Sequence, residues 1–224
     1  MNVALLSESP ADEAALRWLV EAVLADSFVL VRPGWRARGW PNVAQVLPAI
    51  LRHLHFNTEV EGLAVVVDSD DSVVHTAGHE APGYFHPQCR LCQLRGIFHR
   101  TQKRFPPRHG RDRVLRAVGI AVPAIEAWYL CGQDPQVTEL AWMDGQAQGA
   151  APYTRRDLKW RVYGTDRPSL GFEIQRAVDC VRRHHGDPRR LEADFPNGFG
   201  ALARDLRAWR GGGHPGEQEP GVCA

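Results

Sequence analysis

LAVVVDSDDS (Leu63–Ser72) is the clearest strand signal in this sequence, a continuous apolar run that ends abruptly in acidic residues. A strand that is covered on both faces, as in a parallel sheet between two layers of helices, has this pattern. VALLS (Val3–Ser7) has the same apolar character, and Glu8 follows it directly. The two stretches predict an α/β protein that is built on a buried parallel sheet.

Strand and helix patterns alternate along the first part of the chain, which favours a parallel sheet with helices on both faces. Pro48 is expected to kink or break one of these helices. Two more helices are expected near Ser169–His184 and Phe199–Trp209, whereas Gly132–Pro168 is polar, rich in glycine and without a clear pattern. The expected strands are Val3–Ser7, Phe28–Val31, Leu63–Ser72 and Arg113–Val122, and the expected early helices start near Pro10 and cover Pro41–Leu54, Cys89–Phe105 and Pro123–Leu130.

The chain has 224 residues, of which 44% are hydrophobic, and this is enough for one good core. We expect a single domain over residues 1–210, with a core at about 1–132 and a helical C-terminal part at about 150–210. Residues 211–224 are rich in glycine and proline and are expected to form a disordered tail. The net charge is only +1, so attraction to nucleic acid or to a membrane requires local clusters of charge.

Sequence signals for secretion and membrane insertion are missing. No apolar run approaches the length of a membrane span, and the N-terminus lacks the basic region and cleavage site of a signal peptide. The cysteines number five, which argues against a disulfide scaffold. We therefore expect a cytoplasmic protein that does not bind membranes.

Acidic residues follow two of the predicted strands. Glu8 follows the first strand, and Asp68 and Asp70 end the third. Ligands of parallel α/β sheets bind beyond the carboxyl ends of the strands, so these carboxylates converge if the two strands are neighbours. One turn of helix returns Asp12 towards the same group. Clustered carboxylates repel one another unless a cation neutralises them, which favours a site for Mg²⁺ or Mn²⁺. Alternatively, these acids only cap a turn and a helix.

Glu126 is a further acid, and it follows the fourth predicted strand in the segment IEAWYL. It either joins the carboxylates at the edge of the sheet or hydrogen-bonds a neighbouring loop while Trp128 packs into the core. The sequence leaves both interpretations open.

LLSESPADEAAL, VVVDSDDS, VPAIEAWYL and FPNGFGALARDLRAW follow one another along the chain. In this order, the four segments resemble motifs of Toprim-domain proteins of the DUF4276 type and of the related OLD nucleases. LLSESPADEAAL resembles the first Toprim motif, in which a strand ends in Glu-Gly before an acidic helix start, and VVVDSDDS resembles the Toprim Asp-x-Asp motif. VPAIEAWYL is similar to the Glu-Ala-Trp segment after the last core strand, and FPNGFGALARDLRAW resembles the C-terminal helix. The resemblance covers the chain from Val3 to about Trp209, with one departure at Ser9, where the motif usually has glycine.

This resemblance implies a Rossmann-like Toprim core and a Mg²⁺- or Mn²⁺-dependent nuclease or related phosphodiester-processing enzyme. Carried over by position, the metal ligands are Glu8, Asp12, Asp68 and Asp70, and the catalytic acids are Glu8, Asp68 and Asp70. Glu8 acts either as a metal ligand or as a general base. The resemblance also implies bacterial defence against phage with a partner ATPase, which must be a separate chain because the Walker A pattern does not occur here.

Two other functions fit the same residues. One is a non-catalytic Toprim module that binds nucleic acid or the partner ATPase, and the other is a small-molecule phosphohydrolase that uses the same metals. The intact acids favour an enzyme. Ser9 favours the module, because glycine at this position allows close approach of a phosphate to the backbone.

The segment from Arg90 to Arg116 is strongly basic, although the whole chain is nearly neutral. A basic helix with Phe98 and Phe105 available for stacking is typical of a surface that binds nucleic acid. The alternative is an ordinary solvated helix face. The residues expected to contact phosphates are Arg95, Arg100, Lys103 and Arg104.

A Cys-x-x-Cys pair lies at the start of the same basic segment. Cys89 and Cys92, flanked by His86 and His99, form a candidate Zn²⁺ site, although a single helix seldom supplies a whole site. The alternative is two reduced thiols beside polar surface histidines. His75 and His79 in the preceding loop could instead face the carboxylates, but no spacing argument selects them.

Overall fold

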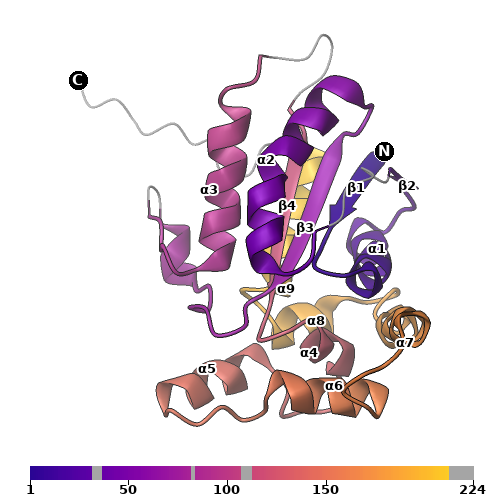
Figure 1. Ribbon diagram of the computed structural model, residues 1–224, viewed down its shortest axis with the longest axis vertical. Coiled ribbons are helices and arrows are strands. Elements are labelled where there is room, and N and C mark those ends of the chain that lie inside the picture. Colours follow the sequence, from indigo (N-terminus) through magenta and orange to yellow (C-terminus); the bar gives the residue numbers. More distant parts are fainter. Residues whose placement is uncertain (32–36, 82–83, 107–112, 212–224) are drawn as a thin grey trace.

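The computed structural model describes residues 1–31, 37–81, 84–106 and 113–211 (Figure 1). It contains a four-stranded parallel sheet in the order β2-β1-β3-β4. The predicted α/β, Rossmann-like fold is confirmed. The strands are β1 (Asn2–Leu6), β2 (Val29–Leu30), β3 (Gly62–Asp68) and β4 (Leu115–Ala121).

The central strands are apolar because helices cover both of their faces. Every residue of β3 is buried, and β3 pairs with β1 on one side and with β4 on the other. The run that predicted a buried strand at Leu63–Ser72 therefore lies in the middle of the sheet, and the strand itself ends at Asp68. The remaining acids of that run belong to the turn that follows.

Two layers of helices enclose the sheet (Figure 1). On one face, α2 (Trp40–Asn57) packs against α3 (Arg90–Gln102). On the other, α1 (Pro10–Leu24) packs against α7 (Leu170–Arg182) and α9 (Phe199–Ala208), and α9 also packs against β4. A hydrophobic cluster that extends from β1 to Trp209 joins these layers.

Local sequence signals explain where several helices begin. The Ser9 side chain caps α1 by accepting a 3.2 Å hydrogen bond from the amide of Asp12, and Pro10 occupies the first turn. The helix α2 continues through Pro48, so the expected break does not occur.

The stretch Gly132–Pro168, which gave no clear pattern, contains two helices, α5 (Glu139–Ala147) and α6 (Arg155–Tyr163). Thr138 caps α5, and Thr154 forms a capping box at the start of α6. Both helices lie beyond the carboxyl ends of the strands (Figure 1). The shorter elements are α4 (Glu126–Leu130), α8 (Arg189–Asp194) and the 3₁₀ turns η1 (Ala77–Glu80) and η2 (Trp209–Gly211).

The strand order creates a crevice between β1 and β3. After β1 the chain passes into α1 on one face of the sheet, and after β3 it passes into α3 on the other face. Ligands of open parallel sheets bind at such a switch point, beyond the carboxyl ends of the strands. The segments after β1 and β3 are the ones that carry Glu8 and Asp68.

The sequence predicted a disordered C-terminal tail and no membrane-spanning segment. Within the predicted disordered tail, residues 212–224 lie outside the described residues. Among the described helices, none is both long enough and apolar enough to cross a bilayer.

Candidate functional site

Glu8 and Asp68 meet at the crevice between β1 and β3. The two strands are direct neighbours, with Leu6 paired to Val65, as the convergence of the acids requires. The backbone amide of Asp68 donates a 2.9 Å hydrogen bond to Glu8 Oε1. The two carboxylates that the sequence placed on separate strands therefore belong to one site.

The acids line a small pocket of about 200 Å³ at this crevice. Asp12 faces the same pocket from the first turn of α1, as one turn of helix predicts. Glu126, the first residue of α4, is buried and also lines it, while Trp128 is fully buried in the core. Glu126 therefore joins the acidic group, which we call the acidic pocket: Glu8, Asp12, Asp68 and Glu126. A fifth acid, Glu173 on α7, also lines the cavity.

Burial shifts the protonation of all four acids. It raises the pKa of Asp12 to about 7, with repulsion from Glu126 as the next cause. It raises the pKa of Asp68 well above its usual value, and the charges of Glu126 and Asp12 raise it further. The pKa values of Glu8 and Glu126 are raised by burial as well. Carboxylates that are crowded in this way favour a neutralising cation.

Asp70 does not enter the acidic pocket. Asp70 was predicted to end the strand with Asp68, but it follows the end of β3 in a left-handed conformation, with φ 47°, so the chain turns away from the strand direction there. Its carboxylate accepts a 2.6 Å hydrogen bond from Arg90 Nη1 and another from Arg155 Nη1. The Asp70 carboxylate is therefore already neutralised by two guanidinium groups.

Arg155 connects the two aspartates. Its Nη2 donates a 2.6 Å hydrogen bond to Asp68 Oδ2, while its Nη1 binds Asp70. Arg155 and Lys159, both on α6, line the acidic pocket together with the carboxylates. Neither Arg155 nor Lys159 was predicted from the sequence as a site residue. The capping box at Thr154 was the signal that could have located their helix.

A larger open cleft of about 900 Å³ adjoins the acidic pocket. Asp70, Arg90 and Arg155 line it, and Arg155 borders both cavities. Trp40 lies along the same cleft, with the Arg90 guanidinium 5.3 Å from the centre of its ring. The cleft therefore presents cationic and aromatic groups next to the carboxylates.

The basic segment is divided between the interior and the surface. Arg95 pairs with Glu80 and Asp205, so it is engaged within the fold. Phe98 and Phe105 are buried, and the prediction that they are available for stacking is wrong. The exposed cations are Arg100, Lys103 and Arg104, at the far end of α3 from Arg90. Arg108 and Arg111 lie outside the described residues.

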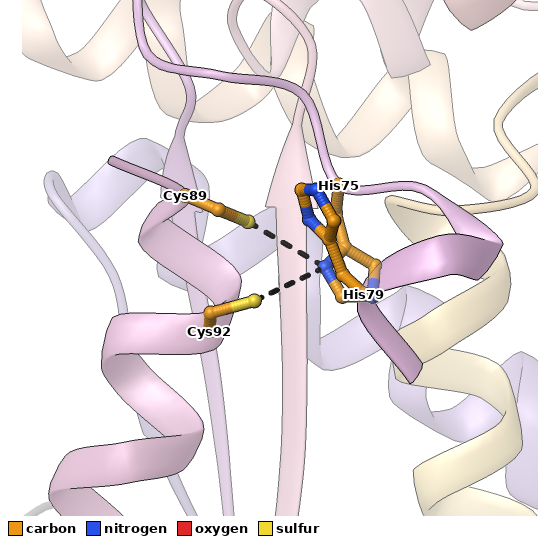
Figure 2. Close-up of side chains that lie close together, drawn as sticks. All are labelled: His75, His79, Cys89 and Cys92. Atoms are coloured by element: carbon orange, nitrogen blue, oxygen red, sulfur yellow. Dashed lines mark hydrogen bonds between the residues drawn. The ribbon is translucent and has the colours of Figure 1, made fainter. Parts of the chain in front are cut away.

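Cys89 and Cys92 meet two histidines, but not the two that were predicted. His75 and His79 face them from the preceding loop and η1, and the four ligand atoms all lie within 4.8 Å of one another (Figure 2). They do not face the carboxylates. We call this group the His/Cys cluster: His75, His79, Cys89 and Cys92.

The structure leaves both predicted zinc histidines outside the His/Cys cluster. His86 stacks on the His79 ring at a centroid distance of 5.0 Å, and His99 is exposed further along α3. In the structure, His75 and His79 therefore take the positions beside the cysteines that were predicted for His86 and His99. The His-x-x-x-His spacing of His75 and His79 is a typical metal-ligand spacing, and it was the signal that could have identified them.

Comparison with known proteins identifies no relative: no family model, no curated protein and no solved structure matches this chain significantly.

Proposed function

We propose that this protein is a Mg²⁺- or Mn²⁺-dependent phosphodiester hydrolase, most specifically a nuclease. The observation that carries the proposal is the acidic pocket, in which two buried and two half-buried carboxylates converge at the switch point of a parallel sheet. Glu8, Asp12 and Asp68 are three of the four acids that the resemblance to Toprim nucleases assigned to metal binding. Glu126 takes the place that Asp70 was expected to fill.

The residues of the acidic pocket fit a hard divalent cation. They offer carboxylate oxygens, which Mg²⁺ and Mn²⁺ prefer, and repulsion among the carboxylates adds to burial in raising the pKa values of Asp12 and Asp68. Glu8, Asp12, Asp68 and Glu126 would hold the cation. When bound, such a cation activates water and stabilises the leaving oxygen of a phosphodiester.

Backbone amides orient two of these carboxylates. Asp68 Oδ1 accepts a 2.9 Å hydrogen bond from the amide of Ile125, and Glu8 Oε1 accepts one from the amide of Asp68. One oxygen of each carboxylate is therefore fixed by the main chain. A ligand shell that is held in place before the cation arrives is what a hydrolytic metal site needs.

The adjoining cleft supports a nucleic-acid substrate. Arg90 and Arg155 are placed to bind phosphate oxygens, and Trp40 offers a ring on which a base can stack. Arg155 borders both cavities, so it can hold a phosphate at the edge of the acidic pocket. A small-molecule phosphate ester would use the same groups but would leave most of the cleft empty.

A second candidate is a non-catalytic module that binds nucleic acid or a partner ATPase. Arg155 favours it, because this residue already pairs with Asp68 and Asp70 and thereby occupies the place of an external cation. A role in defence against phage, with or without catalysis, belongs to the same proposal and rests on the resemblance alone.

The test is incubation of the purified protein with plasmid DNA, single-stranded DNA and RNA, each with Mg²⁺, Mn²⁺ or EDTA. We expect metal-dependent cleavage of at least one substrate and a loss of several orders of magnitude in the Asp68→Asn variant. The matched control is Asp144→Asn, which changes an exposed acid on α5 and should leave cleavage unchanged. Binding of nucleic acid without cleavage under any of these conditions would favour the module instead.

A further inference from the structure

We propose that the His/Cys cluster is a structural Zn²⁺ site, separate from the acidic pocket. Its ligands come from two places in the chain: His75 and His79 from the loop and 3₁₀ turn after β3, and Cys89 and Cys92 from the start of α3. His75, Cys89 and Cys92 are buried. Figure 2 shows both thiols directed at the His75 ring.

The spacing of the ligand atoms matches tetrahedral zinc. Cys89 Sγ lies 3.5 Å and Cys92 Sγ 3.7 Å from His75 Nδ1. With Zn–S of about 2.3 Å and Zn–N of about 2.0–2.1 Å, tetrahedral angles separate a sulfur from a nitrogen ligand by about 3.6 Å. Both sulfur–nitrogen separations to His75 therefore already match coordination, and the four ligand atoms lie close enough together for one cation to reach them all.

Glu80 orients His75 as metal sites usually require. His75 Nε2 and Glu80 Oε1 are 2.9 Å apart, so Nε2–H donates to the carboxylate and the Nδ1 lone pair faces the thiols. A ligating histidine commonly donates its second ring nitrogen to a carboxylate in this way, which fixes the tautomer. Arg95 Nη1 in turn holds Glu80 Oε2 at 2.7 Å. The cluster thus has an ordered second layer of hydrogen bonds.

His79 supplies an independent indication. Its Nδ1 is buried, and within the described residues it has no hydrogen-bond partner. A buried polar atom without a partner costs free energy, and coordination to a metal removes that cost.

The ligand types select zinc and a structural role. Two thiolates with two imidazoles suit Zn²⁺, whereas Mg²⁺ prefers oxygen ligands. Four protein ligands close the coordination shell and leave no position for water or substrate, as in structural rather than catalytic sites. The spacings His-x-x-x-His and Cys-x-x-Cys lie within the ranges that such sites use.

The site would fasten the loop after β3 to the first turn of α3. Arg90 lies between the two cysteines in that turn, and its Nη1 donates to the backbone oxygen of Asp68 at 2.7 Å and to Asp70 at 2.6 Å. Zinc would therefore hold Arg90 in place beside the acidic pocket without taking part in its chemistry.

The first test is the metal content of protein purified under reducing conditions without chelators. We expect about one zinc per chain in the wild type. Replacing Cys89, Cys92, His75 or His79 singly with alanine should reduce the zinc content at least several-fold. The matched controls are His86→Ala, His99→Ala and Cys180→Ala, which change neighbouring or buried residues of the same types outside the cluster and should retain zinc. Zinc-free wild-type protein, or equal zinc in the cluster variants and the controls, would overturn the proposal.

The second test does not depend on the variants folding. Co²⁺ added to reduced, metal-free wild-type protein should give the visible absorption of a tetrahedral thiolate site and saturate at about one equivalent. Zn²⁺ should then abolish these bands, and excess Mg²⁺ should not. If Co²⁺ gives no tetrahedral spectrum, the group is merely a pair of reduced thiols beside two histidines and the proposal fails. Either result is independent of whether the acidic pocket cleaves phosphodiesters.

Discussion

The backbone amide of Asp68 donates a 2.9 Å hydrogen bond to the Glu8 carboxylate, across the boundary between β3 and β1. This contact joins the ends of two adjacent parallel strands at the switch point of the sheet. It fixes one oxygen of Glu8, and the side chains of Asp12 and Glu126 line the same pocket. Repulsion among these carboxylates should therefore affect both the stability of the protein and its affinity for a metal ion.

Asp12→Asn should make the metal-free protein more stable and the metal less effective. Asp12 lies half-buried among other acids, and burial together with repulsion from Glu126 raises its pKa, so the charged form is disfavoured there. Asparagine keeps the size of the side chain but removes the repulsion. We expect the melting temperature in EDTA at neutral pH to hold or rise, while the increase caused by added Mn²⁺ becomes smaller, because the folded state binds the ion less tightly.

Thermal unfolding of both proteins across a Mn²⁺ titration checks this prediction. Asp144→Asn serves as the control, because Asp144 is exposed on α5 and away from the pocket lining. Equal Mn²⁺-induced shifts in the wild type and Asp12→Asn would show that Asp12 is not a ligand.

Arg155→Gln should separate metal binding from catalysis. Arg155 pairs with both Asp68 and Asp70, so it competes with an external cation for the same charge. Its removal should strengthen Mn²⁺ binding several-fold, as measured by calorimetry, because the acids lose their internal partner. Cleavage should nevertheless fall, because the residue that can hold the phosphate is gone. Weaker Mn²⁺ binding in this variant would contradict the competition.

Charge reversal at the far end of α3 should affect long nucleic acids only. Arg100 lies ten residues after Arg90, which is about 15 Å along the helix. On the proposed function, an oligonucleotide of two or three units would occupy the cleft alone, whereas a long duplex would also reach Arg100, Lys103 and Arg104. Replacing these three with glutamate should leave binding of the short ligand unchanged.

The same variant should weaken binding of a long duplex and flatten its salt dependence. Each phosphate contact that is lost should lower the slope of log K against log salt by about 0.9. Binding measurements over a range of salt concentrations, with Arg210→Glu on η2, an exposed cation outside α3, as a control, test this prediction. An unchanged slope would mean that these three residues form an ordinary solvated surface.

The sheet and the meeting of Glu8 with Asp68 could be predicted from the sequence for a physical reason. Strands buried on both faces show as continuous apolar runs, and the acids after them must lie at one edge of a parallel sheet. Asp70 could not be placed, because its left-handed backbone conformation turns the chain away from the strand direction. Strand periodicity does not extend into a turn.

Residues supplied by irregular segments could not be placed at their sites from the sequence, although a capping box and a His-x-x-x-His spacing mark the segments that carry them. Arg155 comes from a stretch without clear periodicity, and only the tertiary packing of α6 beyond the sheet brings it to Asp68. His75 and His79 lie in a loop and a 3₁₀ turn, where no repeat fixes the direction of a side chain. Cys89 and Cys92 were correctly predicted as a pair at the start of the basic segment, but the predicted His99 lies further along α3 and outside the cluster.

Asp205→Ala should strongly destabilise the fold. The buried Asp205 carboxylate accepts a 3.1 Å hydrogen bond from the amide of Val118 and pairs with Arg95 and Arg116 at 3.5 Å each. Removing one partner of a buried ion pair leaves uncompensated charge and costs about 3–5 kcal/mol. The melting temperature should fall by roughly 6–20 °C.

Scanning calorimetry with a surface control tests the cost of losing Asp205. Asp179→Ala removes an exposed pair with Arg182 and should change the free energy of unfolding by less than about 1 kcal/mol. Similar small effects in both variants would show that the Asp205 carboxylate does not hold α9 against β4.

Glu139→Gln should reduce the pH dependence of stability. Burial raises the pKa of Glu139 to about 7, although its Oε2 accepts a 2.7 Å hydrogen bond from the amide of Asn197. The folded state therefore holds a proton that the unfolded state releases above about pH 4.5. Stability from this group is fully present below that pH and is lost as the pH rises through about 7, by up to about 3 kcal/mol.

Glutamine does not titrate, so its contribution stays constant over this window. As the pH rises from about 5 to about 8, the wild type should therefore lose up to about 3 kcal/mol of stability relative to Glu139→Gln. Urea unfolding at several pH values measures this difference. Asp166→Asn, which changes an exposed acid paired with Arg156, should show a difference that stays constant with pH. If Glu139→Gln behaves like that control, Glu139 is ionised in the folded protein at neutral pH and the hydrogen bonds from Asn197 outweigh its burial.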